Sequence, residues 1–152
     1  MENDSVRELW ESFQQQNPNL PEHYDVWSFG DSAELANELA GLVLEGLKTA
    51  TCSLKRDYEV NDKPLPKENS YSVILGGNGE AVGIIQTLSV VVFPFDEVTE
   101  SIASDEGEGD RSISYLKEVH KTFFKRECEA IDEPFNTKMD IVCQRFELVY
   151  AA

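Results

Sequence analysis

The stretch YSVILGGNGEAVGIIQTLSVVVF, residues 71–93, decides the fold. Residues 71–75 are a short apolar run typical of a buried strand, and Gly-Gly-Asn-Gly at 76–79 is rich in residues that tolerate positive φ angles. Residues 81–93 contain many β-branched side chains, which favour one long strand or two short ones. The stretch therefore predicts a β-hairpin in the middle of the chain.

Helical periodicity appears on both sides of this hairpin. Apolar side chains recur at helical spacing in three segments, residues 5–15, 31–46 and 112–129. In the second segment, Asp31 and Glu34 have the spacing of a capping box, and Gly46 is suited to end the helix in a left-handed conformation. The chain is thus predicted to carry helices before and after its central strands.

Two further segments have extended character. Residues 49–53 predict a strand that continues toward Tyr58 and Val60, and residues 140–150 alternate as a closing strand does. Strands in the middle and at the end, with flanking helices, predict an α+β fold built on a small β-barrel or curled sheet. We expect one domain over residues 1–152, with residues 1–20 as an N-terminal helical extension.

Charge limits the partners of such a domain. The 152 residues include 29 acidic and 13 basic side chains, for a formal net charge of −16. This field repels polyphosphate at long range, whereas proteins that hold duplex nucleic acid by its backbone are usually basic. We therefore expect no binding of duplex DNA, and any nucleic-acid role needs a local basic patch or a pocket for a base.

The cysteines and apolar runs bear on the compartment. Cys52, Cys128 and Cys143 are odd in number and widely spaced, which fits neither a disulfide framework nor a zinc site. No secretory signal is evident, and the apolar run at 88–95 is too short to cross a bilayer. We expect free thiols, a cytoplasmic protein and no membrane partner; we also expect no cofactor.

Four elements in order carry a family resemblance. They are Phe-Gly-Asp-Ser at 29–32, Gly-Leu-Lys-Thr-Ala-Thr at 46–51, Glu-Gly-Glu-Gly-Asp-Arg-Ser at 106–112 before a helix with His120, and Cys-Gln-Arg-Phe at 143–146. From about Trp27 to Tyr150 the chain resembles a stand-alone bacterial ASCH domain. The resemblance implies a PUA-like β-barrel with a cleft lined by Lys48 and Thr51. It also implies activity toward RNA or modified nucleosides.

Lys48 and Thr51 have functional and structural interpretations. In a cleft, Lys48 with a lowered pKa can act as a base, with Thr51 as nucleophile or orienting group. Alternatively, Lys48 complements the negative end of the preceding helix. Residues three apart on a strand face opposite sides, so the two can share a cleft only through a bend.

The acidic run offers three interpretations. Glu106, Glu108 and Asp110 precede a predicted helix, where carboxylates are stabilised by the free N–H groups, and Asp110 or Ser112 can cap it. One glutamate can instead enter the cleft as the acid that partners Lys48, and we select Glu108. Alternating carboxylates can also hold a divalent ion, but the spacing does not match an EF-hand loop. We expect no metal.

The remaining candidates are a histidine, two aromatic side chains and several polar ones. His120 falls on an apolar helical face and is interpreted as a core residue. Trp27 and Phe29 are candidates for stacking on a base, although aromatics beside strands are more often core. Lys48, Lys55, Arg56 and Arg111 are candidates for a local positive patch. The predicted substrate-binding residues are Trp27, Phe29, Ser53, Lys55, Arg56, Arg111 and Ser112.

Three functions stay open at this point. The first is a module that binds a base or a short single-stranded RNA. The second is a hydrolase, of ribonuclease or nucleoside amidohydrolase type, with Lys48, Thr51 and Glu108 as catalytic residues. The third is a pocketed protein for an unrelated small metabolite, and a fold alone does not choose between these three.

Overall fold

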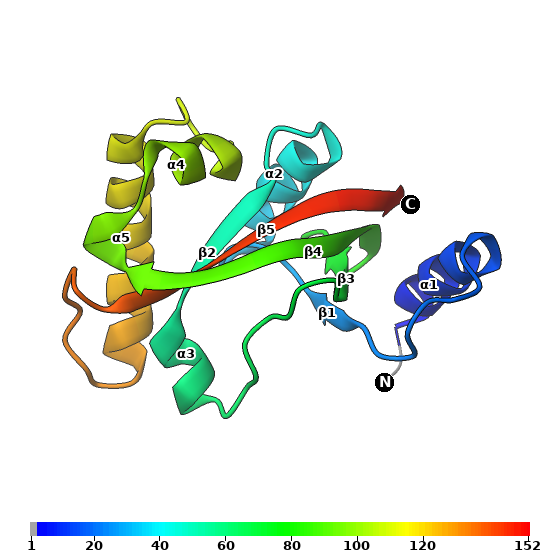
Figure 1. Cartoon of the computed structure of the whole chain (residues 1–152), viewed down its shortest axis with the longest axis horizontal. Helices are drawn as coiled ribbons and strands as arrows, with labels where there is room; N and C mark the ends of the chain where they lie inside the picture. The colour runs from blue at the N-terminus through cyan, green and yellow to red at the C-terminus, as the bar shows by residue number, and fades with distance from the viewer. Residues whose placement is uncertain (1–2) are drawn as a thin grey trace.

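The structure is a computed structural model that describes residues 3–152, so the first two residues of the predicted N-terminal extension lie outside it. In chain order its elements are α1 (Asp4–Gln16), β1 (Asp25–Trp27), α2 (Ala33–Leu44), β2 (Ala50–Leu54), α3 (Lys55–Val60), β3 (Tyr71–Leu75), β4 (Ala81–Pro94), the 3₁₀ helix η1 (Phe95–Glu97), α4 (Glu100–Glu106), α5 (Ile113–Ala130) and β5 (Asp140–Ala151). The helices surround a single sheet (Figure 1). The predicted α+β class is confirmed.

The sheet is a curled half-barrel of five strands in the order β1-β3-β4-β5-β2. The β1–β3 pair is parallel and the other pairs are antiparallel. Strand β5 lies between β4 and β2 and so joins the β3–β4 hairpin to β2, which forms one edge of the sheet. The predicted hairpin is confirmed, with β3 at the predicted residues and β4 as one long strand.

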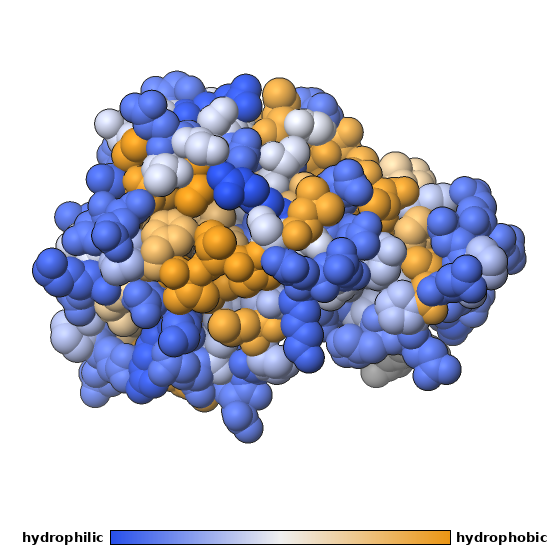
Figure 2. All heavy atoms as spheres, viewed as in Figure 1, coloured by the Kyte–Doolittle hydropathy of each residue, from blue (hydrophilic) through white to orange (hydrophobic). Residues whose placement is uncertain are grey.

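Strand β4 changes partners along its length. Its first half lies between β3 and β5, and a register irregularity follows between Thr87 and Ser89. From Ser89 onward β4 pairs with β5 alone, so this half is an open edge of the sheet. Leu88, Val91 and Val92 are exposed there, and Figure 2 shows apolar surface over β4 in the middle of the molecule.

Three clusters of buried side chains hold the helices to the sheet. Helices α4 and α5 pack on the face of β2 and β5 that carries Cys52 and Cys143. Helix α2 packs on the opposite face, around Phe146, and α1 covers the far end of the hairpin around Ile84. In Figure 1, α5 and α1 accordingly lie at opposite ends of the sheet.

Helix boundaries and two short helices differ from the sequence-based expectation. Residues 55–60, expected to be extended, form α3. This short segment is held by the local contact Ser53–Tyr58 and the long-range ion pair Arg56–Glu133, which outweigh β propensity. Helix α4 was not predicted because its seven residues are too few to show a period. The cap of α2 is Ser32, whose hydroxyl accepts from the backbone N–H of Leu35, rather than Asp31.

Candidate functional site

Lys48 lies in the turn that follows α2. Gly46 has φ +79° and ends the helix in the predicted left-handed conformation. The backbone N–H of Lys48 then donates to the carbonyl of Leu42 at 3.1 Å, which fixes the start of β2. From this position the Lys48 side chain turns inward and is only 1% exposed.

Four oxygens surround the Lys48 ammonium. Its Nζ donates to Oε2 of Glu108 at 2.7 Å and to Oε2 of Glu106 at 3.4 Å. The carbonyls of Ala50 and Glu106 accept from it at 2.9 and 3.4 Å. A buried ammonium is tolerated only with such a complete set of acceptors.

A second cation lies on the other side of Glu106. His120 Nε2 lies 3.2 Å from Oε1 of Glu106, an ion pair without the alignment of a hydrogen bond. His120 Nδ1 lies 3.0 Å from the carbonyl of Leu116, which can only accept, so Nδ1 carries a proton. Because Nε2 faces a carboxylate, a proton on Nε2 is favoured as well, and Glu106 stabilises the imidazolium form of the ring.

The charges in this cluster move each pKa in a defined direction. Burial alone would lower the pKa of Lys48, but Glu106 and Glu108 outweigh it and raise the pKa above its ordinary value. Burial disfavours the charge on His120 too, yet Glu106 raises its pKa. Lys48 is therefore a permanent ammonium at neutral pH, and the sequence-based role of Lys48 as a base with a lowered pKa is wrong.

The two glutamates differ although they share the cation. Burial would raise the pKa of Glu106, but Lys48 and His120 hold it far below its usual range. Burial and the neighbouring negative charge of Glu106 raise the pKa of Glu108 to about 7, against the opposing effect of Lys48. Glu108 is consequently the group of the cluster that changes charge near neutral pH.

Gly107 allows both glutamates to approach Lys48. It ends α4 with φ +69°, in the left-handed region. A Cβ atom at this position would overlap the carbonyl oxygen of Leu47 and approach the backbone nitrogen of Lys48. The Glu-Gly-Glu motif thus places a carboxylate on each side of a glycine that packs directly against the lysine turn.

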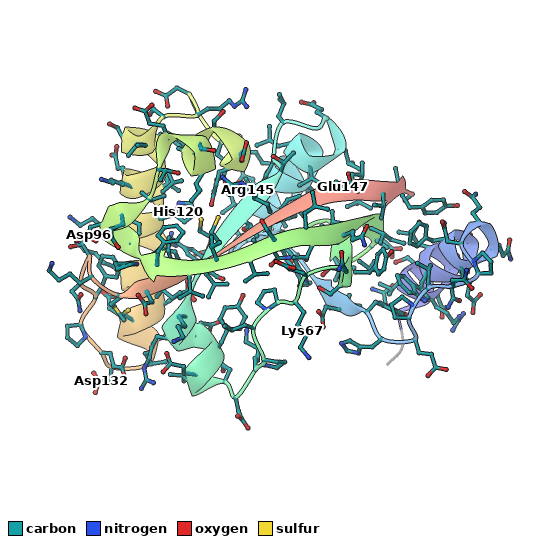
Figure 3. All side chains as sticks on the ribbon, in the orientation of Figure 1. Lys67, Asp96, His120, Asp132, Arg145 and Glu147 are labelled. Carbon is teal, nitrogen blue, oxygen red and sulfur yellow. The ribbon has the colours of Figure 1, made fainter. Side chains whose placement is uncertain are left out.

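The cluster borders a narrow pocket on the α5 side, which in this structure has no room for a water molecule. Its lining includes Glu106, Glu108, Ser112, Tyr115, Val119 and His120. Glu108 and His120 are the accessible charged groups of the cluster, with 14% and 12% of their side chains exposed, whereas Glu106 is 2% exposed. His120 projects from α5 toward the sheet (Figure 3).

The structure does not bring Thr51 to this cluster. Thr51 pairs with Gln144 and lies on the face of β2 opposite to Ala50 and Cys52. No bend reverses this alternation, and within residues 3–152 no hydrogen bond joins Thr51 to Lys48. Ser53 shares the Thr51 face, where its hydroxyl bonds that of Tyr58 at 2.9 Å.

The expected positive patch does not form. Lys48 is buried and neutralised, and the Arg56 guanidinium is held by Glu133 at 2.8 Å. Lys55 and Arg56 begin α3, beyond the far end of β2 from Lys48. Arg111, in the loop before α5, donates to the carbonyl and the hydroxyl of Ser104 on α4. The four basic side chains therefore lie apart from one another and do not form a common positive surface.

The aromatic candidates also change roles. Phe29 is 3% exposed and packs in the α2 cluster, with its ring centre 5.5 Å from Nζ of Lys48, so stacking on a base is excluded for it. Trp27 is half-buried with its ring edge-on to Phe29. Ser112 caps α5 by accepting from the N–H of Tyr115, and it lines the pocket as well.

Two residues of the cluster, His120 and Glu106, were not assigned to the site from the sequence. His120 was assigned to the core because Leu116 and Phe124 share its helical face, and both are indeed buried. Glu106 was passed over for Glu108 because α4, which positions it, was not predicted. The signal for both was the Glu-Gly-Glu motif followed by a histidine on the next helix, which becomes informative only once α4 and α5 are paired.

In the part of the chain that is described, no group of three or more His, Cys, Asp and Glu side chains is arranged to hold a metal ion. None of the helices in residues 3–152 combines the length and the apolar character needed to cross a bilayer.

Comparison with known proteins agrees with this architecture. Residues 25–150 match the model of the ASCH domain. A crystal structure of a protein from Enterococcus faecalis V583 shares 38% identity, with a TM-score of 0.90 over 97% of this chain and 89% of that one. The ASCH domain from Lactobacillus crispatus JV V101 shares 28% identity, with a TM-score of 0.88 over 97% and 96%. No curated protein matches the chain.

The chain belongs to the ASCH domain family. The resemblance and the PUA-like fold predicted from the sequence are confirmed.

Proposed function

We propose that the protein binds a nucleoside-like ligand, or the base of a short single-stranded RNA, at the pocket above Lys48, Glu106, Glu108 and His120, and that this narrow pocket widens to admit the ligand. The observation that carries this proposal is the meeting of a buried ammonium and a partly accessible carboxyl at one pocket. RNA binding is the role ascribed to ASCH domains, which supports the same class of ligand.

The chemistry of the pocket suits the edge of a base. A base edge presents donors and acceptors side by side, and proteins that read unpaired bases do so by hydrogen bonds to these edges. Glu108 accepts a hydrogen bond when ionised and donates one when protonated. Ser112 adds a hydroxyl at the wall, and the half-buried ring of Tyr115 offers a surface for stacking.

Electrostatics favour a small ligand over a long RNA. The cluster itself is close to neutral, because Lys48 and His120 face two carboxyls. The formal net charge of the chain is −16, and the bases predicted for phosphate contact are dispersed. Affinity for a polymer through its backbone is therefore expected to be weak and strongly dependent on salt.

Hydrolysis of such a ligand is the second candidate, favoured by the pKa of Glu108. A carboxyl with a pKa of about 7 is matched to general acid–base work near neutral pH. Ionised Glu108 can take a proton from water as the water attacks an amide or phosphoryl centre, and then return that proton to the leaving group. Lys48, as an ammonium, would stabilise the developing negative charge.

A paired screen tests the proposal. Modified nucleosides and short single-stranded RNAs are presented to the wild type, Lys48→Met, Glu108→Gln and Thr51→Val, and both binding and product formation are measured. We expect at least a ~10-fold loss of affinity in the Lys48 and Glu108 variants, because each loses a charged hydrogen-bond partner. Thr51→Val is the control on the opposite face of β2 and should bind as the wild type does.

Two results of this screen would count against the proposal. Equal binding by the wild type and Glu108→Gln would remove the pocket as the ligand site. Loss of binding in Thr51→Val alone would move the site to the other face of β2. Turnover by the wild type that Glu108→Gln lacks, at retained binding, would establish the hydrolase.

The pKa of Glu108 gives a stability prediction that needs no ligand. The folded pKa of about 7 lies above the ordinary value of 4.5, so the folded state holds this proton more tightly than the unfolded state. The stability that the proton contributes is complete below pH 4.5 and is lost as the pH rises through about 7. We expect Glu108→Gln to flatten the fall in unfolding midpoint between pH 5 and 8.

Glu127 provides the matched control for this measurement. Its pKa is also raised to about 7, by burial and by Asp57, but it lies on α5 away from the pocket lining. Glu127→Gln should flatten the pH profile of stability in the same way and leave ligand binding unchanged. A Glu108→Gln profile parallel to that of the wild type would show that Glu108 titrates normally.

A further inference from the structure

Cys52 and Cys143 face each other across the β2–β5 ladder. The two residues are direct partners in the antiparallel register. The N–H of Phe146 donates to the carbonyl of Thr49, so Thr49 and Phe146 are a hydrogen-bonded pair. Hydrogen-bonded and non-hydrogen-bonded pairs alternate along an antiparallel ladder. Cys52 and Cys143, three pairs further on, therefore form a non-hydrogen-bonded pair. Side chains are closest at such pairs, with Cα atoms roughly 4.5 Å apart, within the range that a disulfide spans.

We propose that Cys52 and Cys143 are a redox-active dithiol, which a peroxide converts into a cross-strand disulfide. Both thiols are free and buried on the face that carries Lys48 and α5, and the two side chains interact with each other. The proposal concerns the chemistry of this pair and is independent of the ligand proposed above.

The local charges distinguish the two sulfurs. Interaction with the Cys52 thiol lowers the pKa of Cys143, and Arg145 and Lys48 act in the same direction, against the effect of burial. The same interaction and burial raise the pKa of Cys52. Cys143 is thus the nucleophile and Cys52 the resolving thiol, since the thiolate is the reactive form.

The reaction balances with hydrogen peroxide as the oxidant. The Cys143 thiolate attacks one peroxide oxygen, and hydroxide leaves and takes a proton to become water, which gives a sulfenic acid on Cys143. The Cys52 sulfur then attacks the sulfenic sulfur and displaces a second water. Two thiols and one peroxide become one disulfide and two waters.

Access to the pair comes from the edge of the sheet. Strand β2 is the terminal strand of the sheet and is paired on one side only, by β5. Edge strands open locally at lower cost than the strands between them, so we expect slow oxidation limited by opening of β2. Once formed, the disulfide ties β2 to β5 directly beneath the Lys48 turn.

Cys128 is the internal reference for the test. It is buried on α5, with Met139 sulfur at 4.0 Å, and has no cysteine opposite to it. The full chain is exposed to hydrogen peroxide in a time course, denatured and alkylated. The remaining thiols are counted by intact mass, and cross-linked peptides are sequenced. We expect labelling to fall from three thiols to one, with residues 52 and 143 in a single linked peptide pair and Cys128 still labelled.

The controls keep the test decisive. Thiol reductant should restore all three labels, and Cys128→Ser should fall from two labels to none. Cys52→Ser should accumulate sulfenic or higher oxides on Cys143 and form no internal disulfide. The proposal would be overturned if the wild type kept three labelled thiols under conditions that oxidise Cys143 in the Cys52→Ser variant. A disulfide that includes Cys128 would overturn it as well. The wild-type peptide map stands alone if a variant does not fold.

Discussion

Replacement of Lys48 by methionine is expected to destabilise the fold by about 3–5 kcal/mol at pH 8, the typical cost of removing one partner from a buried ion pair. The side chain is 1% exposed, and its removal leaves the carboxylates of Glu106 and Glu108 without their shared ammonium. His120 continues to compensate Glu106, so the largest deficit falls on Glu108.

The deficit should depend on pH in a defined direction. Without the ammonium, the folded state binds protons at the glutamates more tightly, which stabilises it at low pH. The variant should therefore approach wild-type stability toward pH 5 and fall behind as the pH rises. Urea unfolding at pH 5 and 8 measures both values.

Two further variants control this experiment. Lys121 is exposed on α5, and Lys121→Met should change stability by no more than about 0.5 kcal/mol. Adding Glu108→Gln to Lys48→Met should recover part of the loss, because the unpaired charge is removed. Equal stability of Lys48→Met and Lys121→Met would show that the ammonium is not buried with its carboxylates in solution.

Replacement of Gly107 by alanine should be the most disruptive change in the acidic motif. The position has φ +69°, and an added Cβ would overlap the carbonyl oxygen of Leu47, a backbone atom that cannot rotate away. Strain and overpacking together predict a loss of roughly 2–4 kcal/mol. Because the loop between Glu106 and Glu108 must shift, ligand binding should be lost as well.

A matched substitution at Gly46 distinguishes the cost of backbone strain from the cost of steric overlap. This glycine has φ +79°, but an added Cβ would meet nothing within 4 Å. Gly46→Ala should therefore cost only the conformational term, about 1 kcal/mol, and retain binding. Thermal and urea unfolding of the two variants give the comparison, and equal losses would show that the Gly107 turn has room for a side chain.

Local pattern predicted the elements whose signal lies within a few residues. The hairpin at 71–93, α5 and β5 follow from periodicity and from the glycine-rich turn. The parallel pairing of β1 with β3 was not predictable in this way, because β1 has three residues and its partner lies far along the chain. The long-range ion pair Arg56–Glu133 likewise holds α3 against its apparent β propensity.

The site shows the same division. Lys48 was reached through the family resemblance and Glu108 was selected from the acidic run; in the structure, Nζ of Lys48 lies 2.7 Å from Oε2 of Glu108. Thr51 was grouped with them on the assumption of a bend, whereas strict alternation along β2 separates them. His120 was out of reach, because an ion pair between α4 and α5 leaves no trace in the periodicity of either helix.

The place of β5 has a consequence for folding order. Residues 140–151 pair with both β4 and β2, so the ladder that holds β2 joins Ala50 to Arg145, which lie far apart in the sequence. Closing such long loops is slow, because the entropy of closure is lost before the contacts form. The lysine turn is therefore expected to become ordered late, when β5 joins β2. Until then, Cys52 and Cys143 belong to separate segments, and their thiols are open to solvent and to wrong pairing.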